Sequence, residues 1–176
     1  MFRKATLNDS NRIVEIYDEL HIEQEKQNSS VSIGWKRGVY PTESTAQTAI
    51  ASGEMFVEEA DGVIVASARI NHVQLDEYAE VKWKYPASND EIMVLHTLAV
   101  SPKVKRNGYG TKFMKFYEQY SLENGCRYLR IDTWEKNLVA RALYKKLGYN
   151  EVGVVTSEFN GIGNFRLVCL EKKLER

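Results

Sequence analysis

Residues Val104 to Met114 read V-K-R-N-G-Y-G-T-K-F-M, and this stretch decides how the rest of the chain is interpreted. It follows an apolar run that ends at Pro102, and it leads into a pattern typical of a helix. Glycine adopts backbone conformations that bring N–H groups close to a ligand, and the first turn of a helix leaves its N–H groups unpaired. A phosphate or pyrophosphate would suit such a loop. A tight turn with solvated lysines would give the same pattern, so the loop alone leaves both interpretations open.

Two familiar phosphate loops do not match the stretch. The motif G-x-x-x-x-G-K-[ST] is absent, because a single residue separates Gly108 from Gly110. The dinucleotide motif G-x-G-x-x-G has Phe113 where its third glycine should stand. ATP and NAD are therefore not the ligands that this loop indicates.

The sequence on either side of the loop predicts a succession of strands and helices. Apolar periodicity and turn residues predict helices over 10–27, 43–52, 109–124 and 137–147. They predict strands over 2–7, 55–60, 63–70, 91–100, 127–133, 151–159 and 165–173. Asp61-Gly62 predicts a hairpin between the second and third strands. Asn8-Asp9 is expected to cap the first helix, whose apolar stripe comprises Ile13, Ile16, Tyr17 and Leu20. A strand, a helix and another strand in succession form a parallel crossover. We therefore expect an α/β fold, in which a mixed sheet has helices on both faces, and a single domain over residues 1–176.

The bulk composition narrows the function classes. The chain has 176 residues, with 24 basic and 24 acidic side chains, and this balance argues against a broad nucleic-acid or membrane surface. No apolar run reaches the roughly 18 residues of a membrane span, and the first residues do not resemble a signal peptide, so we expect a cytoplasmic protein. Cys126 and Cys169 lie in no metal-ligand spacing, and we expect free buried thiols rather than a disulfide.

A second group of residues lies between Trp134 and Tyr149, in the sequence W-E-K-N-L-V-A-R-A-L-Y-K-K-L-G-Y. Asn137 is placed to cap the predicted helix, and Tyr144 follows on nearly the same helical face. A separate apolar stripe is expected to pack on the sheet, and it comprises Val139, Ala140, Leu143 and Leu147. Asn137 and Tyr144 would then flank a cleft, although an ordinary surface tyrosine would fit the same spacing.

Three segments, taken in order, resemble the GCN5-related N-acetyltransferase (GNAT) family. They are H-T-L-A-V-S-P from His96, K-R-N-G-Y-G-T-K-F-M from Lys105, and N-L-V-A-R-A-L-Y-K-K-L-G-Y from Asn137. The resemblance is close over about residues 91–150, and the flanking order of strands agrees with it. The family's phosphate loop reads [QR]-x-x-G-x-[GA]. Lys105 departs from its first position but keeps the charge, and Arg106 is the neighbour that could supply what is lost.

The resemblance implies acetyl-CoA as the donor and a GNAT fold in a single N-acetyltransferase domain. Backbone groups of Leu98, Ala99 and Val100 would pair with the pantetheine arm, in a slot that a bulge opens between the parallel strands. The N–H of Leu98 would polarise the thioester carbonyl. Asn137 would bond the pantetheine, with Ala140 beside it. The pyrophosphate would be held by the loop residues Lys105, Arg106, Asn107, Gly108, Tyr109, Gly110 and Thr111.

The resemblance also implies an acid and a base. Tyr144 would protonate the departing thiolate. A histidine has a pKa suited to taking a proton from the amine, and some family members carry paired histidines where this chain has only His96, with Val94 at the partner position. Glu91, acting through water, is the alternative base. A histidine packed in the core would explain His96 equally well.

The acceptor is the part that the sequence leaves open. Segments that build family acceptor pockets contain the aromatic residues Trp35, Tyr40, Trp83, Tyr85 and Phe159 and the acidic residues Glu43, Asp76, Glu77 and Glu80. Such side chains suit an amine cation, but solvated acids and structural aromatics explain them too. We expect a primary amine as acceptor, no nucleic acid, no membrane and no metal, with a homodimer as a family-level expectation. The alternative is a non-catalytic acyl-CoA-binding regulatory module, which would need neither Tyr144 nor His96.

Overall fold

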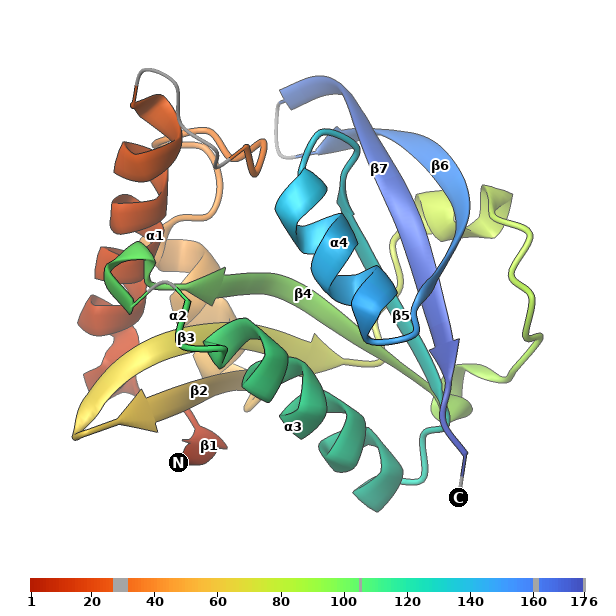
Figure 1. Cartoon of the computed structure of the whole chain (residues 1–176), viewed down its shortest axis with the longest axis horizontal. Coiled ribbons are helices and arrows are strands. Elements are labelled where there is room, and N and C mark those ends of the chain that lie inside the picture. Colours follow the sequence, from red (N-terminus) through yellow and green to blue (C-terminus); the bar gives the residue numbers. More distant parts are fainter. Residues whose placement is uncertain (27–31, 105, 160–161, 176) are drawn as a thin grey trace. The chain divides into compact units, whose positions relative to one another are not determined.

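The structure of the protein is a computed structural model that describes residues 1–26, 32–104, 106–159 and 162–175 (Figure 1). Its helices are α1 (Ser10–Glu25), α2 (Glu43–Ala51), α3 (Tyr109–Glu123) and α4 (Leu138–Lys146). Its strands are β1 (Phe2–Lys4), β2 (Met55–Ala60), β3 (Val63–Asn71), β4 (Ile92–Val100), β5 (Tyr128–Trp134), β6 (Asn150–Phe159) and β7 (Ile162–Lys173). The short 3-10 helices are η1 (Leu7–Asp9), η2 (Asp76–Glu80), η3 (Asn89–Glu91) and η4 (Pro102–Val104). Within the described ranges, no helix has the length and apolar character needed to cross a membrane.

The strands form a seven-stranded sheet in the order β1-β2-β3-β4-β5-β7-β6. β4 and β5 are parallel, in register from Ile92↔Tyr128 to Leu95↔Ile131. The pairs β1–β2, β2–β3, β5–β7 and β6–β7 are antiparallel. Parallel neighbours need a long crossover, and α3 provides it here. The predicted fold class, a mixed α/β sheet with a parallel pair in its middle, is confirmed.

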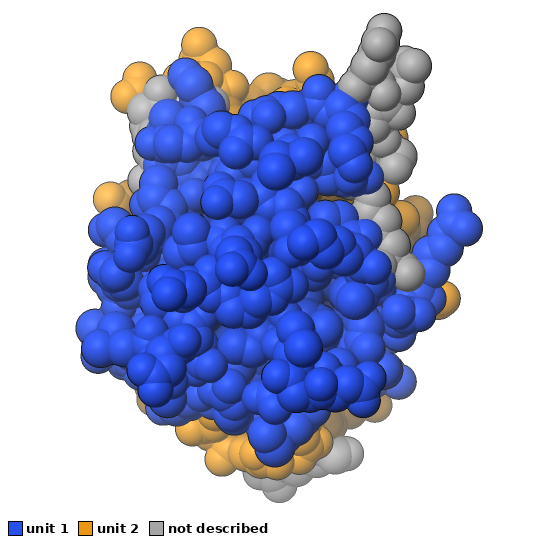
Figure 2. Space-filling model, turned by 90° about the vertical axis from the view of Figure 1, so that its left-hand side faces the viewer, with its two compact units in different colours: residues 1–31, 35–70, 96–116 blue, residues 32–34, 71–95, 117–176 orange. Residues whose placement is uncertain are grey.

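The chain divides into two compact units whose segments alternate along the sequence (Figure 2). Unit 1 comprises residues 1–31, 35–70 and 96–116, and unit 2 comprises residues 32–34, 71–95 and 117–176. Some boundaries between the units fall inside a strand or helix. Residues of β4 up to Leu95 belong to unit 2 and the later ones to unit 1, and residues of α3 up to Phe116 belong to unit 1 and the later ones to unit 2. Each unit is therefore built from segments that lie far apart in the sequence.

Unit 1 contains the apolar stripe predicted for α1. Ile13, Ile16 and Tyr17 are fully buried, and each such side chain contributes about 1.5–3 kcal/mol by leaving water. The β2–β3 hairpin turns at Asp61 and Gly62, whose φ angles are 51° and 77°. These positive angles are the ones that an Asp-Gly hairpin turn requires, so the hairpin predicted from this dipeptide is confirmed.

The first strand ends earlier than the predicted range 2–7, and Asp9 explains why. The Asp9 carboxylate accepts hydrogen bonds from the Thr6 N–H at 2.7 Å and from the Arg3 guanidinium at 2.7 and 2.9 Å. The bonds from Arg3 lower the pKa of Asp9 to about 2. Asp9 precedes α1 as predicted, but its side chain closes the turn of η1 and does not cap the helix.

Unit 2 packs strand residues against η2. Tyr78 of η2 is 2% exposed and belongs to a buried cluster with Val94 of β4 and Cys169 of β7. Cys169 and Cys126 are both buried and free, which confirms the expected thiols. Burial of the cluster therefore holds the irregular segment after β3 against the sheet.

Tyr117 joins the two parallel strands from α3. Its hydroxyl donates to the carbonyl oxygen of Met93 at 2.7 Å and to that of Arg130 at 3.3 Å. Both acceptors belong to strand backbone, β4 and β5 respectively. A single buried phenol therefore bridges the parallel pair, and its own polar atom is satisfied.

One residue of the apolar stripe predicted for α4 is wrong, whereas Ala140, Leu143 and Leu147 are half-buried. The apolar stripe predicts Val139 inside, yet Leu138 and Val139 are 68% and 65% exposed, and Tyr144 is 4% exposed. A tyrosine ring removes more apolar surface from water than a valine side chain does. Burial of Tyr144, whose ring centre lies 6.1 Å from that of Tyr149, therefore decides the face that α4 buries.

Gly34 lies against an aromatic pair of unit 2. The rings of Trp134 and Phe165 stack with their centres 5.6 Å apart. A Cβ added to Gly34 would lie 2.4 Å from Phe165 Cζ and 2.8 Å from Trp134 Cδ2. The φ of Gly34 is 76°, which residues with side chains rarely adopt. Glycine is therefore required at this position by both contact and conformation.

We expect Gly34→Ala to lower the free energy of unfolding by about 2–4 kcal/mol, because it adds overpacking to backbone strain. Gly38→Ala is the matched control, since Gly38 has a φ of 72° but a Cβ there would meet nothing within 4 Å. Urea unfolding measures the free energy of unfolding of both variants, and the difference between their losses isolates the contact with the stacked rings. Equal losses in the two variants would contradict this packing account.

Candidate active site

The predicted phosphate loop contains two left-handed residues before α3 begins. Arg106 and Gly108 have φ angles of 67° and 73°, and α3 starts at Tyr109. Left-handed residues turn successive N–H groups toward one side, which favours anion binding. The N–H of Lys112 donates to Gly108 O at 2.9 Å, so the N–H groups before Lys112 are those that a helix start leaves unpaired. Lys105 lies outside the described residues.

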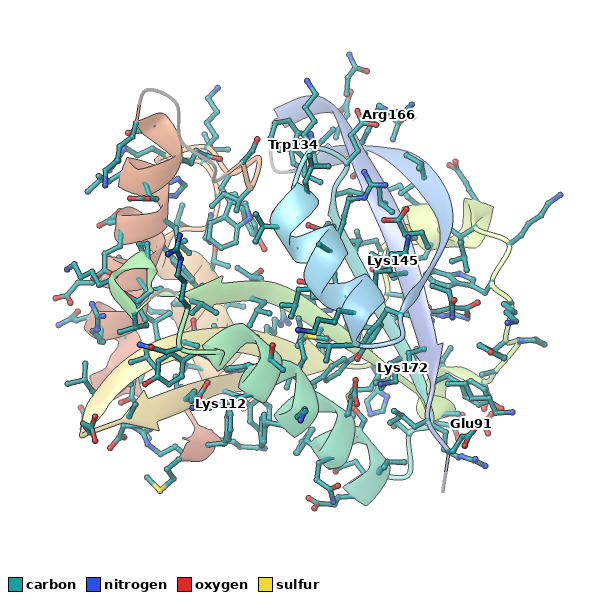
Figure 3. The ribbon with its side chains drawn as sticks, viewed as in Figure 1. Glu91, Lys112, Trp134, Lys145, Arg166 and Lys172 are labelled. Atoms are coloured by element: carbon teal, nitrogen blue, oxygen red, sulfur yellow. The ribbon has the colours of Figure 1, made fainter. Side chains whose placement is uncertain are left out.

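The surroundings of the loop fit a pyrophosphate. A Cβ added to Gly108 would meet nothing within 4 Å, so the space beside it is open. Lys112, labelled in Figure 3, is exposed on the first turn of α3, with its Nζ 4.7 Å from the centre of the Tyr109 ring. Backbone N–H groups, a helix N-terminus and an ammonium group are the donors that a phosphate needs. The residues present therefore match the diphosphate of the implied donor.

A hydrogen-bond network holds the start of this loop within unit 1. Ser101 follows β4, and it donates from its N–H to Val65 O at 2.8 Å and from its hydroxyl to Glu19 at 2.5 Å. Glu19 also pairs with Arg12 and with Lys103, both at 2.8 Å. Burial alone would raise the pKa of Glu19, but these bonds outweigh it and lower that pKa. The loop is thus anchored to α1 and β3 by a carboxylate that stays ionised.

The carboxyl end of β4 is irregular at Thr97. Its φ is 55°, an unusual value for a β-branched residue, and its hydroxyl forms a hydrogen bond with the hydroxyl of Tyr40. A left-handed residue inside a strand is one way to build the bulge that the resemblance implies. Ala99 is buried, and the other predicted residues of this strand end are half-buried, namely His96, Leu98 and Val100.

Glu91 lies before the first residue of β4, and it is exposed (Figure 3). Its Oε2 accepts hydrogen bonds from the Ser88 hydroxyl at 2.6 Å and from the Ser88 N–H at 3.1 Å. These bonds cap η3 and lower the pKa of Glu91. Residues 92–95 separate Glu91, the last residue of η3, from His96, the central residue of β4, so the two candidate bases belong to different elements.

Asn137 and Tyr144 lie on α4 in unit 2, and Asn137 caps that helix as predicted. Its Oδ1 accepts from the Ala140 N–H at 3.2 Å, and its Nδ2 donates to Thr133 Oγ1 at 3.2 Å. Burial raises the pKa of Tyr144 well above its ordinary value, and the negative charge of Asp132 raises it further. A phenol with a raised pKa stays protonated and can donate that proton to a stronger base.

Asp132 is a polar residue beside Tyr144 that the sequence analysis missed. It follows Ile131, the last β5 residue in the described pairs with β4, and its Oδ2 accepts a hydrogen bond from the Tyr78 hydroxyl at 2.7 Å. Burial raises the pKa of Asp132 to about 6, although the bond from Tyr78 lowers it. The signal that could have identified it is a lone acidic residue in the strand-like run Y-L-R-I-D-T-W.

The aromatic residues proposed for the acceptor pocket have packing partners. In unit 1, Trp35 meets Tyr17 and Tyr40 edge to face, with ring centres 6.0 and 6.3 Å apart. In unit 2, the Arg130 guanidinium lies 4.0 Å from the centre of the Trp83 ring. The Tyr85 ring centre lies 6.2 Å from that of Tyr128, and the Phe159 side chain is outside the description. These contacts support structural roles at least as well as ligand binding.

The acidic residues proposed for the acceptor pocket differ in how exposed they are. Glu43, Asp76 and Glu80 are exposed, whereas Glu77 is half-buried and accepts a hydrogen bond from the Ser157 hydroxyl. Across the residues that the structure describes, no group of three or more His, Cys, Asp or Glu side chains could hold a metal ion.

The candidate site residues are divided between the two units. Unit 1 contains the phosphate loop and the end of β4, and unit 2 contains Asn137, Tyr144 and Asp132.

Comparison with known sequences agrees with the resemblance. The acetyltransferase (GNAT) family profile matches residues 13–149. The uncharacterized N-acetyltransferase YhfO of Bacillus subtilis (strain 168) is 33% identical over 64 residues, which are 36% of this chain and 43% of that protein. The match therefore spans less than half the length of this relative.

Solved structures share the fold at low sequence identity. A GNAT-family acetyltransferase from Streptococcus agalactiae 2603 has a TM-score of 0.84 at 23% identity, with 100% of this chain and 96% of that chain covered. A structure of yncA from Salmonella typhimurium, solved with its cofactor acetyl-CoA, has a TM-score of 0.67 at 17% identity and covers 100% and 94%. These likenesses establish the fold, and the profile match extends over most of the chain. The chain therefore belongs to the acetyltransferase (GNAT) family.

Proposed function

We propose that the protein is an acetyl-CoA-dependent N-acetyltransferase that acetylates a primary amine by direct attack in a ternary complex. The observation that carries this proposal is the start of α3, where the left-handed residues Arg106 and Gly108 precede a helix N-terminus. That arrangement suits a diphosphate, which acetyl-CoA carries. Family membership supplies the reaction class. We also propose that residues 1–176 act as one domain, because β4 and α3 each contribute to both compact units.

The backbone of β4 would bind the rest of the donor. Peptide groups of Leu98, Ala99 and Val100 follow the irregular residue Thr97, and they would pair with the pantetheine arm. The Leu98 N–H would donate to the thioester oxygen as negative charge develops there. Asn137 makes one hydrogen bond with each end of its amide, so it retains an N–H and a lone pair for the pantetheine.

The transfer itself would proceed without an acetyl-enzyme. The amine nitrogen attacks the thioester carbon, the C–S bond breaks, and Tyr144 gives its proton to the departing thiolate. The raised pKa of Tyr144 keeps the phenol protonated at neutral pH. The cysteines are poor competing nucleophiles, because burial raises the pKa of Cys169 to about 12 and also raises that of Cys126.

We propose His96, rather than Glu91, as the base. His96 is the neighbour of Thr97 in the chain, two residues before the Leu98 N–H. The carboxylate of Glu91 is engaged by Ser88, and its lowered pKa makes it a weaker base. The attacking amine would therefore give its proton to His96, His96 would release that proton to solvent, and Tyr144 would regain a proton from solvent before the next turnover.

A CoA-binding regulatory module would share the phosphate loop but would have no use for Tyr144 as an acid. A screen of primary amines for acetyl-CoA-dependent release of free CoA separates the two functions. We expect release with at least one amine and none with acetyl-CoA alone. Binding of acetyl-CoA without release for any amine would favour the regulatory module, and failure to bind would exclude both.

We expect Gly108→Ala to weaken acetyl-CoA binding about 10-fold, because alanine disfavours the left-handed backbone that orients the loop N–H groups. Gly125→Ala is the matched control: its φ is 79°, and a Cβ there also meets nothing within 4 Å, but it lies after the end of α3. Both variants should lose about 1 kcal/mol of stability, and calorimetric titration should show lower affinity in the first alone. Equal affinities of the two variants for acetyl-CoA would show that this loop is not part of the donor site.

We expect Tyr144→Phe to lower kcat about 100-fold, because the thiolate would leave without its proton donor. The Kd for acetyl-CoA should stay within about twofold of the wild-type value, since the ring and its packing are kept. Tyr120→Phe is the control, a half-buried tyrosine of α3 with no proposed role. Normal turnover in Tyr144→Phe would end its assignment as the acid.

We expect His96→Ala to lower kcat about 100-fold, and Glu91→Gln to leave kcat within about twofold. Glu91→Gln should instead weaken the cap of η3 and slightly lower the free energy of unfolding. Steady-state rates at saturating acetyl-CoA measure both variants. The opposite ranking would assign the base to Glu91.

A further inference from the structure

Asp132 is a carboxylate on an apolar face of unit 2. Alternate residues of a strand share one face, and Tyr128 and Trp134, which alternate with Asp132 along β5, pack against the buried cluster around Tyr78. Among the described residues, no lysine, arginine or histidine pairs with Asp132, and its hydrogen bond comes from the neutral Tyr78 hydroxyl. An ionised carboxylate in such surroundings is costly unless a cation neutralises it.

The groups that shift the pKa of Asp132 are neutral or acidic. Arg130 shares its face of β5, but that guanidinium lies over the Trp83 ring and donates to Gln74, so it does not pair with Asp132. On η2, Tyr78 donates its hydrogen bond and Glu77 adds a second negative charge. On β7, Cys169 is the register partner of Asp132, and on α4 Tyr144 has its pKa raised by the charge of Asp132. Burial also raises the pKa of Cys169 to about 12, so that its thiol stays neutral. These groups give the site a negative potential and supply no counter-ion.

We propose that Asp132 binds the ammonium group of the acceptor amine beside Tyr144. This inference rests on the proposed function and adds the residue that binds the acceptor, a primary amine that arrives as a cation. The Tyr78 hydroxyl bonds to Oδ2 and the residue is half-buried, so Oδ1 is the oxygen that we propose for the ammonium group. The ion pair would offset the cost of the buried charge, and it is stronger in an apolar setting than in water. Alcohols and amides of similar shape lack this attraction.

The bound form requires Asp132 to be ionised, which fixes the pH dependence. Because burial raises the pKa of Asp132 to about 6, the affinity for the amine should fall as the pH drops through about 6. The bond from Tyr78 lowers this pKa, so Tyr78→Phe should move the loss of affinity to higher pH. The pKa in the folded protein exceeds the ordinary value of 3.8, so stability falls as the pH rises from about 3.8 to about 6, and the full cost of ionised Asp132 is present above that range. Asp132→Asn should therefore raise the unfolding temperature at about pH 7.5 and have little effect near pH 4.

A titration that needs no turnover tests the site directly. The Asp132 carboxyl carbon is followed by ¹³C NMR against pH, with coenzyme A present, and is assigned by its absence in Asp132→Asn. Butylammonium chloride should lower the titration midpoint, because a bound cation favours the carboxylate. Sodium chloride at equal ionic strength and 1-butanol should leave it unchanged. If butylammonium leaves the titration midpoint of Asp132 unchanged, the inference is wrong, whether or not the protein is an acetyltransferase.

Kinetics with an accepted amine tests the same site in turnover. Asp132→Asn should raise the KM for the amine at least about 10-fold and keep the Kd for acetyl-CoA within about twofold. Asp61→Asn is the matched control, since it removes an exposed carboxylate from the β2–β3 turn, keeps a residue that tolerates the positive φ there, and should change neither value. Tyr78→Phe should shift the acid limb of kcat/KM to higher pH, which a purely structural role would not do.

The two proposals fail in different ways. If the wild type acetylates an amine and Asp132→Asn keeps its KM, the ammonium site is wrong and the proposed function stands. If no amine is acetylated while butylammonium still moves the Asp132 midpoint, the proposed function is wrong and the ammonium site stands.

Discussion

The parallel pairing of β4 with β5 governs where the chain can place its functional groups. Parallel neighbours cannot be joined by a tight turn, so α3 must carry the chain from the carboxyl end of β4 to the beginning of β5. A helix therefore starts just beyond β4, and its unpaired N–H groups become available after the loop that contains Arg106 and Gly108. Tyr117 of that helix donates to backbone carbonyls of both strands, so the crossover also stabilises the pair that requires it.

The described β4–β5 pairs end at Leu95 and Ile131, and polar residues follow them on both strands. On β4, Thr97 takes a left-handed conformation and bonds to Tyr40. On β5, Asp132 places a carboxylate on an apolar face, where burial opposes its charge. Both features cost stability, as strained or desolvated groups at functional sites generally do. Tyr144 is a further buried polar group, and burial raises the pKa of its hydroxyl, which therefore stays protonated at neutral pH.

Local sequence signals predicted the helices, strands and turns well. Contacts between residues far apart in the sequence decided which side chains are buried and which polar groups meet. Asp61-Gly62 predicted the hairpin because its turn chemistry is local, and Asn137 predicted the start of α4 for the same reason. Periodicity failed for Val139, since burial of the larger Tyr144 ring set the face of the helix. Asp132 was missed because its partner Tyr78 lies far away in the sequence, in a segment without period. The role of Gly34 likewise depends on rings brought to it by β5 and β7.

Direct attack in a ternary complex is the central claim, and intact-protein mass spectrometry after mixing with acetyl-CoA tests it most directly. With no amine present, we expect the protein to keep its unmodified mass, because the thiols of Cys126 and Cys169 are buried with raised pKa values. With an accepted amine present, the acetyl group should appear on the amine alone, at the rate of CoA release. An acetyl-enzyme that forms without amine and then passes its acetyl group to the amine would contradict the account.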